Sequence, residues 1–347
     1  MLSRVAARVV HGYRNVRALD IAVVIVSYRS AELVVQCLRS VLAERSTPGL
    51  HIRVAVVDNA SGDFPAISAA IAHEHWSSWA TVVAAPRNGG FAYGCNVGIS
   101  CAFSVATPDY VYLLNPDTQV RPGAIGALVD FLEAHRSVGI AGSGIELPDG
   151  TDWSLAFRFP GLLSELNDGL QVGLASNLLR RWVVARVMSN TPECVDWVCG
   201  ASMMIRTAVL YAIGGLDENY FLYFEETDFC YRAKRAGFPT WYVPDSHVVH
   251  LRGGSTDIPD LSISPNRLPP YWFESRRRYF AVTFGVGYAV ATDLVAVVAH
   301  SLGSVKRFLL GRRRSAIPHF VRDLLRHSVL WSRNRRIAPP RCFSPQS

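Results

Sequence analysis

The sequence predicts an α/β protein with a mostly parallel sheet flanked by helices, followed by a basic helical extension. Four short apolar runs rich in β-branched residues have the pattern of strands that are buried on both faces. These strand candidates are 22–28, 51–59, 81–86 and 110–117. Segments with helical spacing of apolar residues lie after them, at 31–43, 64–73, 91–104 and 122–135. Such alternation is typical of parallel strands joined by right-handed crossovers.

The second half of the chain is less regular. Residues 145–195 lose the alternation, and we expect an irregular, partly helical insertion there. Order returns with 196–205 and with a helix over 206–215 that two glycines end. A further helix is predicted at 225–236 and a last short strand at 240–244.

Charge is distributed unevenly along the 347 residues. Residues 1–19 carry a net +4, the segment from Ser264 to the C-terminus +12, and the part between them −9. With half of the residues hydrophobic, the composition excludes a disordered chain. We expect a basic N-terminal extension, a catalytic-sized domain and a basic helical tail, with a boundary near the Pro-containing stretch 259–270. The predicted limits are 1–19, 20–256 and 257–347.

The cysteines and the N-terminus predict a cytoplasmic protein. The seven cysteines form no CxxC pair and no Cys/His cluster at zinc spacing. Arg8 interrupts the only N-terminal apolar run, so we expect no signal peptide. Reduced thiols that fill the core are the expected state.

Residues 279–303 are the most hydrophobic stretch of the chain, and arginines follow it. Its length could span a bilayer, but Asp293 lies near its centre, where an unpaired charge costs a few kcal/mol. An apolar helix that leads into basic residues favours a position at an anionic membrane face. A true span and a helix docked on the protein's own body are the alternatives.

Polar residues follow the predicted strands, where ligands bind in open α/β sheets. Ser27 and Tyr28 end the first strand, Asp58 the second, and Asn115 and Asp117 the fourth. Neither GxGxxG after the first strand nor GxxxxGK[ST] occurs, which disfavours a dinucleotide oxidoreductase and a P-loop NTPase. We expect Asp58 to accept hydrogen bonds from a base or ribose and Asp117 to bind Mg2+ or Mn2+ together with a diphosphate.

A second cluster combines acidic residues with later histidines. Glu225 and Glu226 are adjacent like charges, which raise the pKa of one of them and suit it to general-base work. Asp228 and Arg232 are spaced as a structural i,i+4 pair. His247 and His250 follow the last predicted strand, and spacing alone does not decide their role.

Seven segments in this order resemble glycosyltransferase family 2, and in particular its bacterial rhamnosyltransferase-like branch. The resemblance covers about residues 21–256. The segments are VSY (26–28), VVDNASGD (56–63), RNGGFAYGCNVGI (87–99), LLNPDTQV (113–120), WVCGASMMIRT (197–207), GGLDENYFLYFEETDFCYRAKRAG (214–237) and VVHLRGGS (248–255).

The resemblance implies a GT-A fold, a nucleotide-diphosphate-sugar donor, a divalent cation and inverting displacement. It assigns Asp117 and His250 to the metal and Glu226 to the catalytic base, where the family usually has an aspartate. Asn115 stands where the family's DxD motif has its first carboxylate. The residues that it assigns to donor binding are Ser27, Tyr28, Asp58, Gly90, Asn96 and Asn115. Those on the acceptor side are Gly200, Asp217 and Glu225.

The predicted function is therefore the inverting transfer of a sugar in cell-surface polysaccharide synthesis, with L-rhamnose from dTDP-L-rhamnose as the favoured donor. A polyprenyl-diphosphate-linked or glycan acceptor is expected, with the enzyme peripheral at the cytoplasmic face of an anionic membrane. The alternatives are a UDP- or GDP-sugar donor, and a non-catalytic module that binds nucleotide sugars or carbohydrate. Nucleic acid is not an expected partner, because the tail lacks interleaved base-stacking aromatics.

Overall fold

The computed structural model describes residues 17–151, 153, 155–170, 179–251, 267–310, 317–331 and 337–345. Most of the predicted N-terminal extension (1–19) and most of the predicted boundary segment (259–270) lie outside the described residues.

The predicted parallel half of the sheet is confirmed. Its order is β3-β2-β1-β4, and all neighbouring pairs in it are parallel. These strands are β1 (Leu19–Ser27), β2 (Leu50–Asp58), β3 (Ala80–Ala84) and β4 (Tyr110–Leu114). The register pairs Ser27 with Asp58, so the first two polar strand ends lie side by side. The connecting helices are α1 (Ala31–Glu44), α2 (Phe64–His73) and α3 (Gly90–Val105).

The sheet continues past β4 with mixed directions. β10 (Ser202–Arg206) is antiparallel to both β4 and β6 (Ile140–Glu146), and β6 is parallel to β11 (Thr240–His250). Two short strands, β5 (Thr118–Val120) and β9 (Glu193–Val195), pair antiparallel with β11. Because β10 runs against β4, its first residue pairs with the last residue of β4, which brings the 199–201 segment to the polar edge.

The last strand is longer than predicted. A short strand over 240–244 was expected to precede His247 and His250, but β11 runs to His250 and contains both histidines. An irregularity between Val243 and His247 interrupts its register with β6. Ser246 is buried within this irregular stretch, and its hydroxyl shares a hydrogen bond of 2.7 Å with that of Ser143 in β6. This bond holds β11 against β6 where the regular pairing is interrupted.

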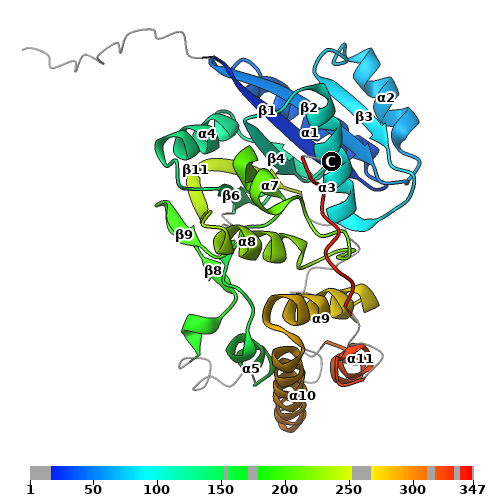
Figure 1. Cartoon of the computed structure of the whole chain (residues 1–347), viewed down its shortest axis with the longest axis vertical. Helices are drawn as coiled ribbons and strands as arrows, with labels where there is room; N and C mark the ends of the chain where they lie inside the picture. Colours follow the sequence, from blue (N-terminus) through cyan, green and yellow to red (C-terminus); the bar gives the residue numbers. More distant parts are fainter. Residues whose placement is uncertain are drawn as a thin grey trace, which may run out of the picture.

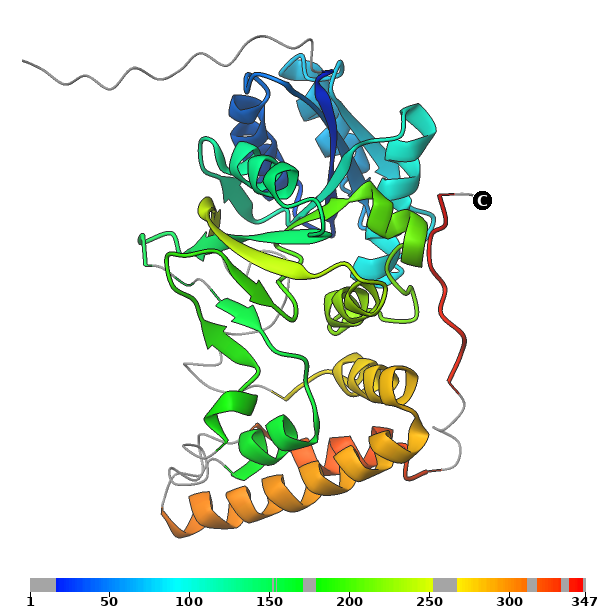
Figure 2. The same cartoon turned by 60° about the vertical axis from the view of Figure 1, so that its left-hand side comes forward.

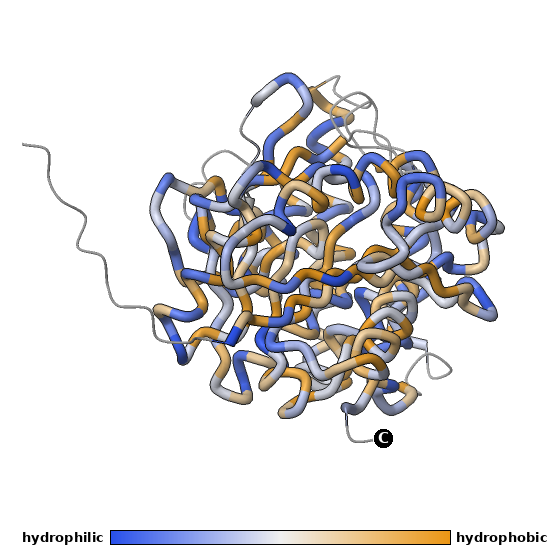
Figure 3. The backbone as a smooth tube through the Cα atoms, turned by 90° about the horizontal axis from the view of Figure 1, so that it is seen from above, coloured by the Kyte–Doolittle hydropathy of each residue, from blue (hydrophilic) through white to orange (hydrophobic). Residues whose placement is uncertain are grey.

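Helices cover both faces of the sheet (Figure 1). Alternate residues of β1 belong to two different hydrophobic cores. Ile21, Val23 and Ile25 pack with residues of α1, α2 and α4 (Ala124–Ala134). Ala22 and Val24 face α3, α7 (Thr207–Ile213) and α8 (Glu225–Arg235). Seen from above, hydrophobic segments run through the centre of the molecule (Figure 3). This two-faced burial explains why β1 is a continuous apolar run.

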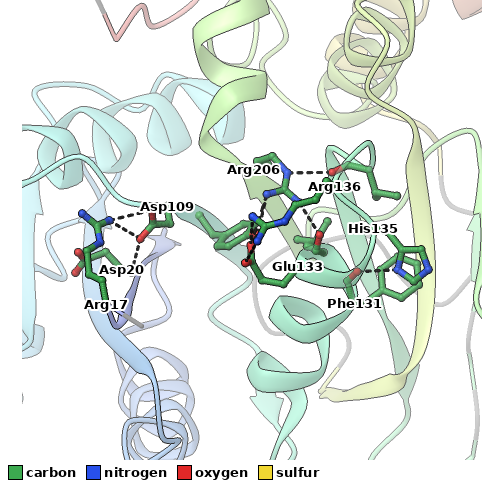
Figure 4. A network of polar contacts seen from close by, with 11 residues as sticks. Arg17, Asp20, Asp109, Phe131, Glu133, His135, Arg136 and Arg206 are labelled. Carbon is green, nitrogen blue, oxygen red and sulfur yellow. Dashed lines mark hydrogen bonds and ion pairs between the residues drawn. The ribbon is translucent and has the colours of Figure 1, made fainter. Parts of the chain in front are cut away.

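A polar network stabilises the sheet at the edge opposite the candidate site (Figure 4). Arg206, at the end of β10, donates to the carbonyls of Leu132 (2.6 Å) and Val138 (3.2 Å). It also donates to the hydroxyl of Tyr110 (2.9 Å), at the start of β4. These bonds connect β10 and β4 to α4 and to the segment that follows it, so the role of Arg206 is structural.

The insertion at 145–195 is irregular and partly helical, as predicted. It contains β7 (Leu155–Phe157), which pairs antiparallel with β8 (Ala185–Val187), and α5 (Leu162–Leu170). Figure 2 shows α5 away from the sheet, among the C-terminal helices. The insertion therefore links the sheet domain to the tail.

The sequence predicts one apolar helix over 279–303, and the structure divides this stretch between two helices. α9 (Pro270–Phe284) ends at Gly285, whose φ of 88° is left-handed, and α10 (Val286–Leu309) starts directly after it. Glycine adopts this conformation without the penalty that a side chain would bring. A third helix, α11 (Phe320–His327), packs beside α9 and α10.

The charge of Asp293 is paired inside this helical module. Arg276 of α9 is 1% exposed and contacts Asp293 of α10 (2.6 Å) and Glu165 of α5 (3.0 Å). Asp293 also accepts hydrogen bonds from the hydroxyl of Ser328 and the backbone N–H of Val329 (3.0 Å). The network joins three elements, and loss of one partner would leave a buried charge unpaired.

The described C-terminal segment 337–345 returns to the sheet domain and runs along it (Figure 2). Its backbone bonds to the 214–219 loop, with Gly215 N to Phe343 O and Glu218 N to Arg341 O both at 2.8 Å. Arg278 of α9 donates to the Ala338 carbonyl (2.8 Å) and to the buried carboxylate of Asp217. The tail is thus bound to the domain at two places.

Candidate active site

The carboxyl ends of β1 and β2 form the predicted donor side. Tyr28 is exposed there, with the Arg29 guanidinium 5.4 Å from the centre of its ring. Asp58 is buried, and its carboxylate accepts from the backbone N–H (2.9 Å) and hydroxyl (2.6 Å) of Ser61 and from Phe64 N (3.0 Å). Burial raises the pKa of Asp58, but these hydrogen bonds outweigh it and the net pKa is lowered. Asp58 is therefore an ionised acceptor at this edge.

Two residues that the sequence analysis did not assign support this edge. Asp63 accepts from the Ser27 hydroxyl (2.9 Å) and from Ser30 N (2.8 Å), so Ser27 is engaged within the protein. The buried Asn59 donates to Asn88 Oδ1 and to the Gly90 carbonyl, both at 3.1 Å. The run DNASGD, with a carboxylate at each end, was the available signal for a structured loop.

Gly90 and Asn96 hold the 215–221 region against α3. Gly90 has a φ of 86°, and a Cβ there would lie 1.9 Å from the Phe221 carbonyl oxygen. The amide of Asn96 donates to Leu216 O (2.8 Å) and Glu218 Oε1 (3.0 Å), and its oxygen accepts from Leu216 N (3.0 Å). Both residues therefore shape the loop beside the site, and direct contact of Asn96 with the donor stays a prediction.

The structure brings Asp117 and His250 together. Pairing of β5 with β11 sets His250 opposite Thr118, and Asp117 Oδ1 lies 3.3 Å from His250 Nε2. Asp117 is 1% exposed. Within the described part of the chain, its Oδ1 and both ring nitrogens of His250 are buried without a hydrogen-bond partner. Trp153 stacks on His250 at 6.5 Å, with the rings 7° from parallel.

This pair fits a divalent cation. Buried polar atoms without partners are costly, and a metal between a carboxylate oxygen and an imidazole nitrogen would satisfy them. No group of three or more His, Cys, Asp or Glu side chains suited to a metal occurs among the described residues. Oxygen ligands from a substrate diphosphate would complete the coordination, which is the usual mode for Mg2+.

Glu225 and Glu226 begin α8, on the other side of the edge. Glu225 is 1% exposed and its Oε2 has no hydrogen-bond partner in the described structure. Burial raises the pKa of Glu225 well above its usual value, and the neighbouring Glu226 adds to the shift. Burial also raises the pKa of Glu226, although its carboxylate accepts from Gly200 N (3.3 Å). A raised pKa suits Glu226 to proton abstraction.

The 199–201 segment connects this glutamate to the Asn115–Asp117 turn. The backbone N–H of Gly200 donates to the Glu226 carboxylate. The carbonyl of the next residue, Ala201, accepts from Asn115 N (3.2 Å). Burial, followed by the negative charges of Glu226, Glu225 and Asp117, raises the pKa of the Cys199 thiol to about 12. The segment is therefore hydrogen-bonded to Glu226 on one side and to Asn115 on the other.

Backbone strain is concentrated directly before the glutamates. Tyr223 and Phe224 have φ values of 70° and 67°, in the left-handed region that costs such residues about 1–3 kcal/mol each. The conformation is held from both sides, because Phe221 O accepts from Phe91 N and Leu222 O accepts from Ser275 Oγ of α9, both at 2.9 Å. The entry of α8 is thus set by α3 and by the tail.

Four polar residues of this region have partners within the protein. Asp217, expected on the acceptor side, is buried, and both of its oxygens are engaged by Arg278, Asn219 and Arg341 N. That environment leaves no free oxygen for an acceptor. The predicted Asp228–Arg232 pair forms at 2.7 Å, and Arg232 also bonds to the Ile213 carbonyl (2.9 Å). His247 Nδ1 lies 3.4 Å from a carboxylate oxygen of Glu146.

Comparison with known proteins identifies the family of this arrangement. A family model described as "Glycosyltransferase like family 2" matches residues 18–267. The chain belongs to this family. The match includes every predicted site residue and most of the sheet domain, so the resemblance seen in the sequence motifs is confirmed.

Two curated relatives align with part of this chain. The N-acetylglucosaminyl-diphospho-decaprenol L-rhamnosyltransferase of Mycobacterium tuberculosis is 32% identical over 152 residues, which are 43% of this chain and 48% of that protein. Rhamnosyltransferase WbbL of Escherichia coli is 27% identical over 169 residues, 46% of this chain and 60% of that one. The alignments thus span about half the length of these relatives.

Solved structures confirm the GT-A-like fold. GalNAc-T7 with UDP, GalNAc and Mn2+ superposes with a TM-score of 0.57 at 14% identity, over 92% of this chain and 59% of that one. The mannosyltransferase PcManGT of Pyrobaculum calidifontis, with GDP-Man and Mn2+, has a TM-score of 0.50 at 16% identity, over 91% and 81%. At these identities the likeness concerns the fold.

Proposed function

We propose that this chain is an inverting glycosyltransferase that moves a sugar from a nucleoside diphosphate to an acceptor hydroxyl. The observation that carries the proposal is the Asp117–His250 pair, whose unpartnered buried atoms fit a cation, joined through the 199–201 segment to Glu226. A cation site and a base at one sheet edge suit displacement at an anomeric carbon. Membership of the family supports the same reaction.

Apart from the cation site, the residues divide into a group that binds the nucleotide and a group that accepts the proton. Tyr28 and Asp58 would hold the nucleotide at the ends of β1 and β2. Glu226 would accept the proton of the acceptor hydroxyl as that oxygen attacks the face opposite the leaving diphosphate. Gly200 N–H would hold the Glu226 carboxylate in position. The raised pKa of the buried Glu225 favours its neutral form, which would lessen like-charge repulsion with Glu226.

Asp117 and His250 would hold Mg2+ or Mn2+, with Asn115 beside them. The bound cation supplies Lewis-acid neutralisation of charge on the leaving nucleoside diphosphate. Two of the structural neighbours are complexes that contain Mn2+ and either UDP or GDP-Man, which supports the choice of cation.

The favoured donor is dTDP-L-rhamnose, and the favoured acceptor is a polyprenyl-diphosphate-linked sugar or glycan. Two curated relatives named as rhamnosyltransferases support the sugar, and the name of the mycobacterial one includes a diphospho-decaprenol carrier. Such an acceptor would place the enzyme at the cytoplasmic face of a membrane, where the basic tail would contact anionic lipid.

A calorimetric donor panel tests the proposal. Purified protein is titrated with dTDP-rhamnose, UDP-glucose, UDP-N-acetylglucosamine and GDP-mannose, each with Mn2+ and with chelator. We expect dTDP-rhamnose to bind only with Mn2+. Binding of a UDP- or GDP-sugar instead would replace the donor and keep the reaction class. A folded protein that binds none of these donors would contradict the proposed function.

A further inference from the structure

α10 presents an apolar face to solvent along most of its length. Five side chains on it, each between 49% and 75% exposed, are Leu294, Val298, Leu302, Val305 and Leu309. Their spacing of four, four, three and four residues keeps them on one side of a helix with 3.6 residues per turn. At 1.5 Å per residue the stripe is roughly 22 Å long. Contiguous exposed apolar surface of this kind marks an interaction site.

The opposite side of α10 is packed against the protein. Its buried residues are small or paired and include Ala296, Ala299, Gly303 and Asp293. By length and composition α10 could cross a membrane, with a mean hydropathy of 1.4, but a third of that window is buried in the protein. A span would carry the Arg276–Asp293–Glu165 network and α5 into hydrocarbon. The structure instead favours a helix with one covered side and one open side.

The basic sequence that follows this face favours an anionic partner. From Lys306 to Arg326 the sequence has seven Lys or Arg residues and a single acid, Asp323. That acid is paired with Arg267 at 2.6 and 2.7 Å, and Arg322, whose side chain is 66% exposed, lies 3.9 Å from it. The single acid of α10 itself, Asp293, is on the buried side. A second copy of this chain would bring like charges together, which opposes self-association.

We propose that the α10 stripe is a membrane-docking surface, on which the protein lies with α10 in the plane of an anionic lipid surface. The five apolar side chains would enter the acyl boundary and the basic residues would contact lipid head groups. In Figure 2 α10 forms the lower border of the molecule, with α5, α9 and α11 above it. The proposal rests on the membrane association proposed above and names the surface that makes it.

This placement relates the lipid to the candidate site. Ser275 of α9 bonds to Leu222, and Trp272 of α9 packs edge-on against Phe224 at 5.9 Å, directly before the glutamates. α9 therefore lies between the start of α8 and the docking stripe. A lipid-linked acceptor whose chain is in the membrane would approach Glu226 from the side of α9.

Vesicle cosedimentation of the full chain tests the surface. Vesicles contain phosphatidylcholine alone or with about one third phosphatidylglycerol. We expect the wild type to prefer anionic vesicles, with binding that weakens as salt rises from about 0.05 to 0.5 M, because screening shortens the range of the attraction. The triple variant Leu294→Gln, Val298→Gln, Leu302→Gln should lose at least 10-fold in partitioning, since three apolar side chains no longer enter the lipid.

A matched triple variant removes exposed apolar side chains elsewhere, with Leu42→Gln, Val105→Gln and Val187→Gln. It should bind vesicles within two-fold of wild type. Equal binding by the α10 variant, or equal loss in both variants, would overturn the proposal. So would membrane association of the wild type that only detergent reverses, which indicates a span, or a dimer in lipid-free solution that the α10 variant dissociates.

Calorimetry with dTDP-rhamnose and Mn2+ on the same three proteins separates the two proposals. Retained donor binding with no vesicle binding in any of the proteins would refute the docking surface alone. Vesicle binding that depends on the α10 stripe, without binding of any donor, would refute the proposed function alone.

Discussion

Asp117 Oδ1 lies 3.3 Å from His250 Nε2, and neither atom has a hydrogen-bond partner in the described part of the protein. The two residues are 133 positions apart in sequence. The antiparallel pairing of β5 and β11 brings them together at the sheet edge, where Leu251 N also bonds to Asp117 O at 2.8 Å. A carboxylate and an imidazole held in this way have the donor atoms of a cation site.

We expect Asp117→Ala to weaken metal-dependent donor binding by at least 100-fold. The proposed cation would lose a protein ligand, and even residues that only orient ligands contribute about 10–100-fold. Calorimetry with dTDP-rhamnose and Mn2+ measures the effect. The exposed Asp130→Ala is the matched control and should bind as wild type. Unchanged affinity in Asp117→Ala would exclude this residue from the proposed metal site.

Glu226→Gln should lower turnover by at least about 100-fold while donor affinity stays within two-fold, because general-base catalysis contributes on that scale. Steady-state rates together with calorimetry check both halves of this expectation. If Glu225→Gln rather than Glu226→Gln produced the loss, the base would be Glu225. The exposed Glu32→Gln serves as the control for removal of a carboxylate.

The pH dependence of wild-type turnover should reflect the environment of Glu226. Burial raises its pKa, so the carboxylate takes up a proton at a higher pH than an ordinary glutamate. Turnover should therefore fall as pH decreases through that raised pKa, with a midpoint above 4.5. An acidic limb at or below the usual glutamate pKa would argue against Glu226 as the base.

Glu225 should make the folded protein less stable as the pH rises. Its pKa is raised in the folded protein, so the neutral form is favoured by folding and this contribution is lost as pH rises through the folded pKa. We expect Glu225→Gln to exceed wild type in free energy of unfolding by on the order of 1 kcal/mol at pH 8. The difference should vanish near pH 4. Denaturant titrations at both pH values measure it, and a gain confined to low pH would contradict the assignment.

Arg278→Ala should lower the free energy of unfolding by about 3–5 kcal/mol, because it leaves the buried Asp217 without its cation. The variant also loses the bond to Ala338 O, which holds the C-terminal segment. Arg39→Ala, which breaks the exposed pair with Glu74, should cost no more than about 1 kcal/mol. Denaturant unfolding compares the two, and similar small losses would show that the Asp217 pair is not required.

The parallel half of the sheet was predictable because its strands are buried on both faces and appear as uninterrupted apolar runs. β6 lacked such a run, since Gly142, Ser143 and Gly144 occupy its centre, and no strand was predicted there. The end of β11 was missed for a related reason: Asp245 and Ser246 resemble a strand terminus, while pairing with β5 and β6 continues the strand to His250.

The candidate site divides in the same way. Polar residues at strand ends and the adjacent glutamates were visible as local patterns, and the order of the motifs indicated the family. Asn59 and Asp63 were not assigned, because their roles consist of hydrogen bonds to Gly90 and Ser27 that depend on how the loops meet. The same limit applied to Asp217, whose ion pair with Arg278 joins residues 61 positions apart.

The sequence by itself determined the α/β class, the family and the position of the polar edge, because these follow from local apolar periodicity and from residues next to strand ends. Only the tertiary structure decided that Asp117 meets His250, that Asp293 is paired by Arg276, and that α10 has one open apolar side. Contacts between distant segments set these features. These contacts are stabilised by burial and by charge pairing between residues far apart in sequence, so no short segment of the chain predicts them.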